Sequence, residues 1–442
     1  MLPKEYAGGS GTEDDPYLIE TPEQLAKIAK DADAGNDFLD VYFLIVADLD
    51  MGAFAWEPIG GCSLFGEQNL FMGIIDGGWH KLTNLTINDT GVYRAGLVNE
   101  LGGEIRNLTI ESGSVVGLGT VGSFASMCTG LIENCVNKAD VQATEAGAGG
   151  FVGSLRPSTV GTGVVGTVRN CVNYGNVTVT SYNGLVAGGI VAELGGNVEG
   201  CANYGFVTSN NSIAGGIAGN MRKNGEGMIA DCYNVGAVMA DGESAGGLIG
   251  QIFQADLTVV NFYNAANITA LVADSYHAFC GTIPSPADDP VMAYCYNNTD
   301  YCNLRLMPGK WDHQVPDTKQ MTTEEMASQD FVDLPNAQAM QKGLWAMDEG
   351  DVNGGMPVFA YQLEEHEPVS GIGSVASEAA VKVWAADGAI TVDGAGDAEV
   401  RVYTVAGMLT FAGSADELAG RAVDAGVYVV SVGGVSRKVM VD

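Results

Sequence analysis

The segment Val168-Arg-Asn-Cys171-Val-Asn173-Tyr-Gly175-Asn-Val177 recurs with small changes through the middle of the sequence. A second motif, Gly-Gly followed by apolar residues, lies between successive copies, as in Gly188-Gly-Ile-Val191 and Gly215-Gly-Ile-Ala-Gly219. A fixed period of this length indicates a solenoid, in which each unit buries its apolar face only against its neighbours. The position of Cys171 is occupied, at intervals of 30 to 36 residues, by Cys135, Cys171, Cys201, Cys232, Phe262 and Cys295.

The composition indicates strands rather than helices. Among 442 residues there are 62 glycines, yet 46% of the residues are hydrophobic, so the chain is not a disordered Gly-rich tract. The repeat lacks the amphipathic runs of about 10 residues that helical repeats need, and it alternates β-branched residues with turn formers. We therefore predict an all-β fold dominated by a parallel β-solenoid (β-helix) over residues 41–302.

The spacing within a unit predicts which side chains face inward. The Cys, the Asn two residues later and the Val six residues later share one parity, so they should line the core together, with Asn stacked on Asn. Parallel strands lie about 4.8 Å apart, whereas disulfides need Cβ atoms about 3.8 Å apart. Cys135, Cys171, Cys201 and Cys232 are therefore predicted to be buried free thiols. Glycines two after the Asn are predicted at turns with positive φ, namely Gly175, Gly205 and Gly236.

Five tyrosines fall at odd offsets from the cysteine position and are predicted to point away from the core. Stacked on successive coils, they would form an aromatic strip suited to sugars or peptides. The alternative is a ladder that only stabilises the sheet and is covered by a loop. A bulge inside the unit would reset the parity. The candidate binding residues are Tyr174, Tyr204, Tyr233, Tyr263 and Tyr296.

The two ends of the solenoid need caps, because they expose sheet edges. Residues 1–40 are predicted to form an N-terminal cap with a short helix after Thr21-Pro22, and residues 303–363 a C-terminal cap. Residues 364–374 change composition and are expected to be a linker. Short alternating runs over residues 375–442 predict a small antiparallel β-sandwich of the immunoglobulin-like or sorting type.

Two resemblances follow from these motifs. Gly9-Ser-Gly-Thr-Glu-Asp-Asp-Pro-Tyr-Leu-Ile-Glu20, Ile75-Asp-Gly-Gly-Trp-His80 and the Gly-Gly-apolar units resemble bacterial proteins with GLUG-motif repeats. Val402-Tyr-Thr-Val-Ala-Gly407 and Ala425-Gly-Val-Tyr428 are similar to the C-terminal sorting domains of type IX secretion in Gram-negative bacteria. The resemblances imply export, surface display and an adhesin-like role, with residues 375–442 as partner of the export machinery. They supply no catalytic residues.

Charge and hydropathy restrict the partners and the cellular location that we expect for the protein. A net charge of −34 disfavours nucleic acid and anionic membranes, which require basic patches. No apolar run reaches the roughly 18 residues that a membrane-spanning helix needs. The first residues do not form a signal peptide, so the protein is either cytosolic or has lost a leader, and the resemblances to exported proteins favour the second. We expect a cell-surface or extracellular location.

The polar residues predict no catalytic constellation, metal site or cofactor. The histidines do not form the His-Glu-x-x-His pattern of zinc proteases. Asp48, Asp50, Asp76 and His80 are the candidates for acid–base chemistry, against a simpler role at turns and strand edges. Residues 349–353 resemble a calcium loop without its closing Glu. The leading hypothesis is a binding or adhesion protein for an extracellular glycan or protein, and the alternatives are a polysaccharide-degrading β-helix enzyme and a structural stalk.

Overall fold

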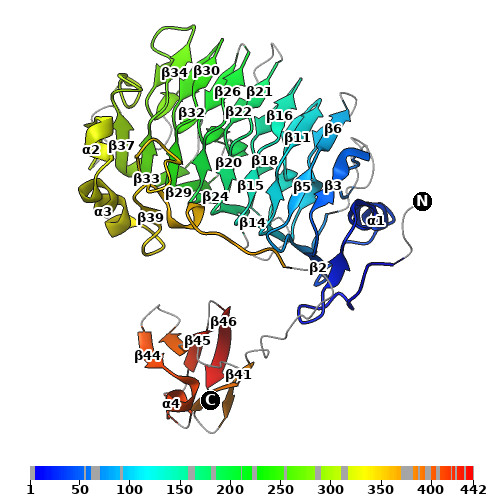
Figure 1. Ribbon diagram of the computed structural model, residues 1–442. Coiled ribbons are helices and arrows are strands. Elements are labelled where there is room, and N and C mark those ends of the chain that lie inside the picture. Colours follow the sequence, from blue (N-terminus) through cyan, green and yellow to red (C-terminus); the bar gives the residue numbers. More distant parts are fainter. Residues whose placement is uncertain are drawn as a thin grey trace. The chain divides into compact units, whose positions relative to one another are not determined.

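The computed structural model shows a parallel β-solenoid followed by a small antiparallel unit (Figure 1). Contacts divide the chain into Met1–Val369 and Ser370–Asp442. Among the residues described below, no helix is long and apolar enough to cross a membrane. The structure describes residues 5–53, 56–60, 70–89, 93–157, 165–180, 186–210, 212–221, 226–252, 256–283, 290–309, 317–369, 382–386, 389–393, 400–404, 409–419, 421–423, 426–432 and 435–441.

Three parallel sheets of seven strands each form most of the solenoid wall. The first contains β6 (Leu85–Asp89), β11 (Gly113–Gly117), β16 (Asp140–Ala143), β21 (Val177–Val179), β26 (Val207–Ser209), β30 (Val238–Ala240) and β34 (Ile268–Ala270). The second contains β7 (Arg94–Ala95), β12 (Thr120–Gly122), β17 (Ala148–Gly149), β22 (Val186–Gly188), β27 (Ile213–Gly215), β31 (Ser244–Gly246) and β35 (Tyr276–His277). The third contains β8 (Val98–Leu101), β13 (Ala125–Cys128), β18 (Val152–Leu155), β23 (Val191–Leu194), β28 (Ala218–Met221), β32 (Ile249–Gln251) and β36 (Cys280–Thr282).

A fourth, larger parallel sheet carries the cysteine motif. Most coils contribute two short strands to it, and the later coils contribute one long strand. Its members are β1 (Tyr17–Ile19), β2 (Tyr42–Ile45), β3 (Leu49–Asp50), β4 (Ile74–Asp76), β5 (Lys81–Thr83), β9 (Glu104–Arg106), β10 (Thr109–Ile110), β14 (Leu131–Glu133), β15 (Val136–Asn137), β19 (Thr167–Arg169), β20 (Val172–Asn173), β24 (Asn197–Glu199), β25 (Ala202–Asn203), β29 (Glu226–Asn234), β33 (Asp256–Asn264), β37 (Val291–Asn298) and β38 (Lys319–Met321).

A stacked bend separates the two halves of each coil in this sheet. The residue before the cysteine position adopts positive φ, for example 54° at Asn134 and 51° at Asn170. Asn and Asp tolerate this region better than other non-glycine residues, and Gly occupies the position at Gly200. The bend resets the parity, so Ile132 and Cys135 both face inward although they are three residues apart. The positions that follow the bend keep the predicted parity.

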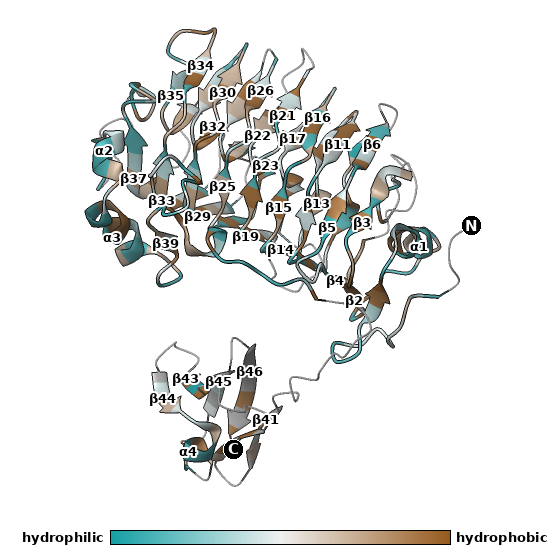
Figure 2. Ribbon diagram, in the orientation of Figure 1, coloured by the Kyte–Doolittle hydropathy of each residue, from teal (hydrophilic) through white to brown (hydrophobic). Residues whose placement is uncertain are grey.

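The predicted interior is confirmed. Cys135, Cys171, Cys201 and Cys232 are free and fully buried, and burial raises the pKa of the Cys171 thiol. Two residues after each cysteine position, the asparagines form a continuous ladder. In it, the side-chain amide nitrogen of each asparagine donates to the side-chain carbonyl oxygen of the asparagine on the next coil. The Nδ2···Oδ1 distances run from 2.8 to 3.2 Å through Asn137, Asn173, Asn203, Asn234, Asn264 and Asn297. Hydrophobic residues recur on the strands around this ladder (Figure 2).

The prediction of positive φ at Gly175, Gly205 and Gly236 is wrong, because none of the three adopts it. A different constraint demands glycine there. A Cβ atom on Gly175 would lie 1.9 Å from the carbonyl oxygen of Ala139, and one on Gly205 would lie equally close to the carbonyl oxygen of Gly175. Close approach of successive coils, rather than backbone conformation, selects glycine at this position.

Helices and short strands close both ends of the solenoid. The predicted helix after Thr21-Pro22 is α1 (Pro22–Asp33). It begins with a capping box, since Thr21 accepts from the Gln24 backbone and the Gln24 side chain accepts from the Thr21 backbone. A 3₁₀ turn, η1 (Met51–Ala53), follows in the first coils. The C-terminal cap contains α2 (Thr323–Met326), α3 (Gln329–Gln338), the antiparallel pair β39 (Trp345–Ala346) and β40 (Val358–Phe359), and η3 (Ala360–Gln362).

The second unit is antiparallel, as predicted. It contains the pair β41 (Lys382–Ala386) and β42 (Ala389–Asp393), and a sheet of β44 (Leu409–Gly413), β43 (Val400–Thr404), β45 (Gly426–Val432) and β46 (Val435–Val441) in that order. Helix α4 (Ala415–Leu418) packs beside them, and the unit has its own hydrophobic core. Part of the expected linker, residues 364–369, belongs to the first unit.

Candidate binding surface

The five candidate tyrosines lie on the outer side of the large sheet, in two neighbouring columns. Tyr233, Tyr263 and Tyr296 pair in register directly before the Asn ladder. Tyr174 and Tyr204 follow it, because each comes directly after a ladder asparagine. The columns join where the Tyr204 and Tyr233 hydroxyls lie 2.7 Å apart. All five therefore face away from the cysteines, but they form a stepped row rather than a straight strip.

The C-terminal cap covers most of this row. Tyr233, Tyr263 and Tyr296 are 0%, 1% and 3% exposed, so the prediction that they form an open ligand strip is wrong. Trp345 packs against Tyr233 and Tyr263, with ring centroids 5.9 and 5.7 Å away, and Phe331 packs against Tyr296. These three tyrosines instead form the covered ladder that was the alternative.

Hydrogen bonds join the C-terminal cap to the tyrosine hydroxyls. The Tyr233 hydroxyl donates to Oε1 of Gln362 over 2.6 Å. The Tyr263 hydroxyl donates to the Pro357 carbonyl and accepts from Nδ2 of Asn353 over 2.6 Å. Burial raises the pKa of both phenols, which keeps them neutral donors. The apolar rings and their polar tips thus both find partners in the cap, which explains why the sequence places tyrosine here.

Tyr174 marks the open end of the row. It is 39% exposed and stacks on Tyr204 with a centroid distance of 4.8 Å. Next to it is a groove of about 260 Å³. The groove is lined by Trp79, Thr109, Asn134, Val136, Asn170, Val172, Tyr174, Tyr361, Gln362, Glu364 and His366. It therefore combines aromatic rings, two amide side chains of the bend and one exposed carboxylate.

A segment of the C-terminal cap borders the groove, and we call residues 363–369 the strap. In Figure 1 the chain runs along the solenoid from β39 toward β2. His366 stacks on Trp79 with a centroid distance of 3.6 Å and an interplanar angle of 6°. The Val369 backbone N–H donates to the Gly78 carbonyl over 2.9 Å, and the Val369 carbonyl lies 2.7 Å from Nε2 of His80. The strap thus ties the C-terminal cap to the first coils.

The acids that were candidates for catalysis are occupied by structural contacts. Asp48 lies 3.0 Å from Nδ1 of His80. Although partial burial acts the other way, hydrogen bonds from His80 and from the Lys81 backbone lower the pKa of Asp48. Asp50 accepts from Asn84 over 2.8 Å, and Asp76 accepts from Nε of Arg106 over 2.8 Å. These acids hold bends and strap contacts in place.

In the loop of residues 349–353, which resembles a calcium site, the backbone is held by the carboxylate of the preceding residue, Asp348. Asp348 accepts from the backbone N–H groups of Val352, Asn353 and Gly355 over 2.7, 2.7 and 3.0 Å. Within the described ranges, no group of three or more His, Cys, Asp or Glu side chains could hold a metal ion. The Asn353 side chain instead donates a hydrogen bond to the Tyr263 hydroxyl.

Asp231 gives a pH-dependent test of the cap interface. It is 3% exposed at the bend, with φ of 52°, and accepts from the Met340 backbone and from Trp345. Burial raises its pKa, so its stabilising contribution is complete at acid pH and is lost as pH rises through that raised value. Asn tolerates the bend conformation and cannot ionise. Asp231→Asn should therefore gain stability relative to the natural chain as pH rises, measured as urea midpoints. A constant difference across pH would contradict this account.

Comparisons with known proteins support the solenoid and leave the family open. No family model matches the chain. Halomucin from Haloquadratum walsbyi is 33% identical over 158 residues, which are 34% of this chain but 2% of halomucin. A "Putative Gly-rich membrane protein" from Evansella cellulosilytica is 34% identical over 135 residues, 29% of this chain and 15% of that protein. The chain therefore spans only a small part of the length of these relatives.

A solved structure has the same fold. The crystal structure of a "putative immunoglobulin A1 protease" from Bacteroides ovatus superposes with a TM-score of 0.54 at 21% identity, covering 81% of this chain and 98% of that one. At this identity the likeness concerns the fold alone. The resemblances to GLUG-motif proteins and to type IX sorting domains stay predictions.

Sequence reasoning located Tyr174 but missed its surroundings. The strap was expected to be a linker, and Trp79, Asn134, Asn170 and His366 were not candidates. Asn134 and Asn170 could have been found, because each precedes its cysteine and repeats with the same period. The contact between His366 and Trp79 joins residues far apart in sequence, so no local pattern reveals it.

Proposed function

We propose that the chain is an exported cell-surface binding protein whose solenoid presents a rigid ligand site at the groove beside Tyr174. The observation that carries the proposal is the combination found there: an exposed aromatic face, the amides of Asn134 and Asn170, and the edge of the strap. Sugars and polar peptides both favour flat faces with a hydrogen-bonding rim. An extracellular glycan is the first candidate ligand, and a host-matrix protein the second.

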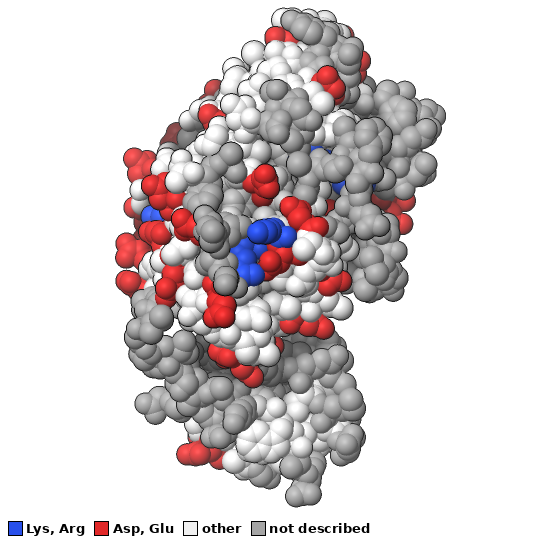
Figure 3. Space-filling model, turned by 90° about the vertical axis from the view of Figure 1, so that its right-hand side faces the viewer, with Lys and Arg blue, Asp and Glu red and all other residues white. Residues whose placement is uncertain are grey.

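Location at the surface is part of this proposal. It is supported by the names of the two relatives, one of which is called a membrane protein. It is also supported by the separate C-terminal unit, for which we propose a role in export or attachment. Acidic residues outnumber basic ones on the face in Figure 3, although Lys or Arg residues gather near its middle. The net charge of −34 disfavours anionic partners.

Binding is proposed in preference to catalysis, because the acids near the first coils already have structural partners. A polysaccharide-degrading enzyme and a structural stalk remain the alternatives. Each makes a different prediction for the same material: turnover of a polysaccharide for the enzyme, and neither binding nor turnover for the stalk.

The test is an array of glycans and matrix proteins probed with the full chain and two variants. Tyr174→Ala should weaken binding about tenfold or more, since loss of an aromatic contact at a binding site commonly has effects of this size. Tyr301→Ala is the matched control, because Tyr301 is 50% exposed and does not line the groove. Its binding should equal that of the natural chain. Equal binding by all three proteins would contradict the assignment, and absence of any ligand would favour the stalk.

A further inference from the structure

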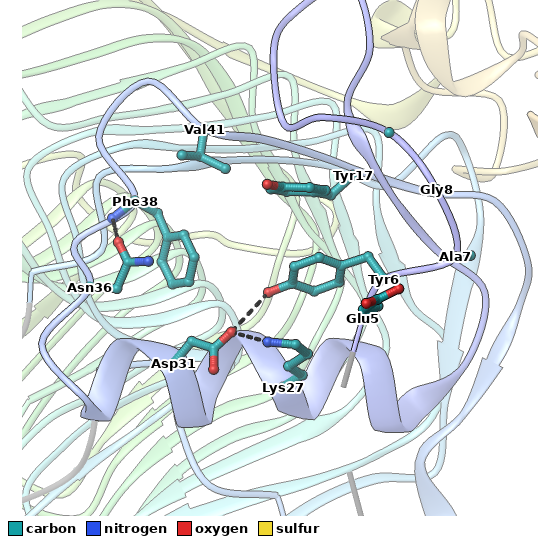
Figure 4. A pocket seen from close by; sticks show the side chains of 11 residues that line it. Glu5, Tyr6, Ala7, Gly8, Tyr17, Lys27, Asp31, Asn36, Phe38 and Val41 are labelled. Atoms are coloured by element: carbon teal, nitrogen blue, oxygen red, sulfur yellow. Dashed lines mark hydrogen bonds and ion pairs between the residues drawn. The ribbon is translucent and has the colours of Figure 1, made fainter. Parts of the chain in front are cut away.

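A second and larger pocket lies at the N-terminal end of the solenoid (Figure 4). Its volume is about 590 Å³, within the range of about 300–1,000 Å³ that is usual for small-molecule sites. The groove beside Tyr174 is smaller, at about 260 Å³. The pocket is bordered by the segment before β1, by α1 and by the loop that leads into β2. Gly9 and Tyr17 of the Gly9–Glu20 motif line it, but the motif did not predict a pocket.

Aromatic rings form its walls. Tyr6 and Tyr17 lie against each other with ring centroids 4.7 Å apart, and Figure 4 shows both hydroxyl ends directed toward the side of Phe38. Phe38 is held by Phe43, whose ring centroid is 5.3 Å away in an edge arrangement. Because Phe43 is buried in the core, these walls rest on the solenoid itself rather than on loop residues alone.

Polar groups without other partners accompany the rings. The Tyr17 hydroxyl makes no hydrogen bond to the described residues, although it can donate and accept. Asn36 uses its Oδ1 to accept from the Phe38 backbone over 3.0 Å, and its amide nitrogen has no partner in the described part of the chain. Both groups line the pocket, so a ligand could satisfy them.

The pocket lining carries one net negative charge, because Glu5 and Asp31 accompany a single cation, Lys27, and this charge repels anions. Lys27 and Asp31, one turn apart on α1, form an ion pair, and the Tyr6 hydroxyl donates to Asp31 over 3.4 Å. The Lys27 ammonium lies 5.0 Å from the centre of the Tyr6 ring and so takes the place that a ligand cation would occupy over that ring. The overall charge of −34 repels anions at a distance. The site therefore favours an uncharged ligand.

We propose that this pocket binds one ring of a neutral sugar. A pyranose has a flat face of C–H groups, which carry the positive partial charge that aromatic faces attract. Its edge carries hydroxyls that donate and accept, as the Tyr17 hydroxyl and the Asn36 amide require. This site is separate from the groove beside Tyr174 and would exist even if that groove bound nothing.

The test uses saturation-transfer NMR on the full chain with three neutral probes: the methyl glycosides of glucose, galactose and mannose. At least one should receive saturation on its ring C–H protons. Choline and glucuronate are run in parallel, and a signal from either of these without one from a neutral glycoside would overturn the proposal. So would the absence of any signal.

Variants locate the signal. Val41→Trp should fill the pocket and abolish the signal, since Val41 lines it and makes hydrogen bonds only through its backbone, with Phe38 and Ile74. Tyr17→Phe keeps the ring but removes the hydroxyl, and should weaken binding about three- to tenfold, the worth of one neutral hydrogen bond. Tyr17→Phe still tests the site if Val41→Trp makes the chain too unstable for the measurement. The pocket variants are made in a chain that also carries Tyr174→Ala, so that the groove cannot supply the signal. Tyr301→Ala is the control and should leave the signal unchanged, because Tyr301 is exposed and lines neither the pocket nor the groove. A signal that survives both pocket variants in the Tyr174→Ala chain would contradict this site.

Discussion

Gly216→Ala should destabilise the solenoid by about 3 kcal/mol, the upper end of the usual cost of overpacking, because the backbone atoms around it cannot easily move away. A Cβ atom on Gly216 would lie 2.1 Å from the carbonyl oxygen of Gly247 on the next coil and 2.4 Å from Cγ of Asn234. Neither neighbour can move freely, since one is backbone and the other is fixed in the Asn ladder. The second glycine of the Gly-Gly motif thus packs directly against the Asn ladder.

Thermal unfolding followed by circular dichroism measures the effect. Gly350→Ala is the matched control in the same unit, because the nearest atoms to its Cβ are side-chain carbons at 3.3 and 3.6 Å. Its melting temperature should change little. If Gly216→Ala melted at the temperature of the natural chain, the coil spacing described here would be wrong.

Asn203→Ala should also cost about 3 kcal/mol or more. Asn203 accepts from Asn173 over 2.8 Å and donates to Asn234 over 2.9 Å and to the Gly205 carbonyl over 3.0 Å. The substitution leaves buried polar groups without partners on both sides, and each such group costs about 1–3 kcal/mol. A cavity adds to the loss.

The control for the ladder is Asn88→Ala, an exposed asparagine on strand β6. It should change the free energy of unfolding, measured by urea denaturation, by less than about 0.5 kcal/mol, as surface substitutions usually do. Equal effects of the two substitutions would show that the ladder contributes no more than a solvent-exposed amide.

The sequence predicted the interior well because the repeat reports it directly. Cys, Asn and Val at fixed offsets face inward on successive coils, and the antiparallel C-terminal unit follows from its alternating strands. The positive-φ bend at positions such as Asn134 and Asn170 was harder to see, since its asparagines resemble ordinary turn residues. The role assigned to Gly175 failed for a related reason: close packing and positive φ both select glycine, and only coordinates separate them.

The binding surface could be predicted only in part. Parity placed the tyrosines on the outside, but it could not show that Trp345 and Phe359 of the C-terminal cap would fold back over Tyr233. That contact spans more than 100 residues of sequence and depends on tertiary packing. The same packing leaves Tyr174 partly exposed and creates the groove.

Nitration of the native chain, mapped residue by residue with mass spectrometry, tests most directly whether the tyrosine row is covered at one end and open at the other. Tyr301, at 50% exposure, calibrates full reactivity, and Tyr174, at 39%, should react as well. Tyr233 and Tyr263, at 0% and 1%, should react only after denaturation. Reaction of Tyr233 and Tyr263 in the native chain, or protection of Tyr174, would contradict the account.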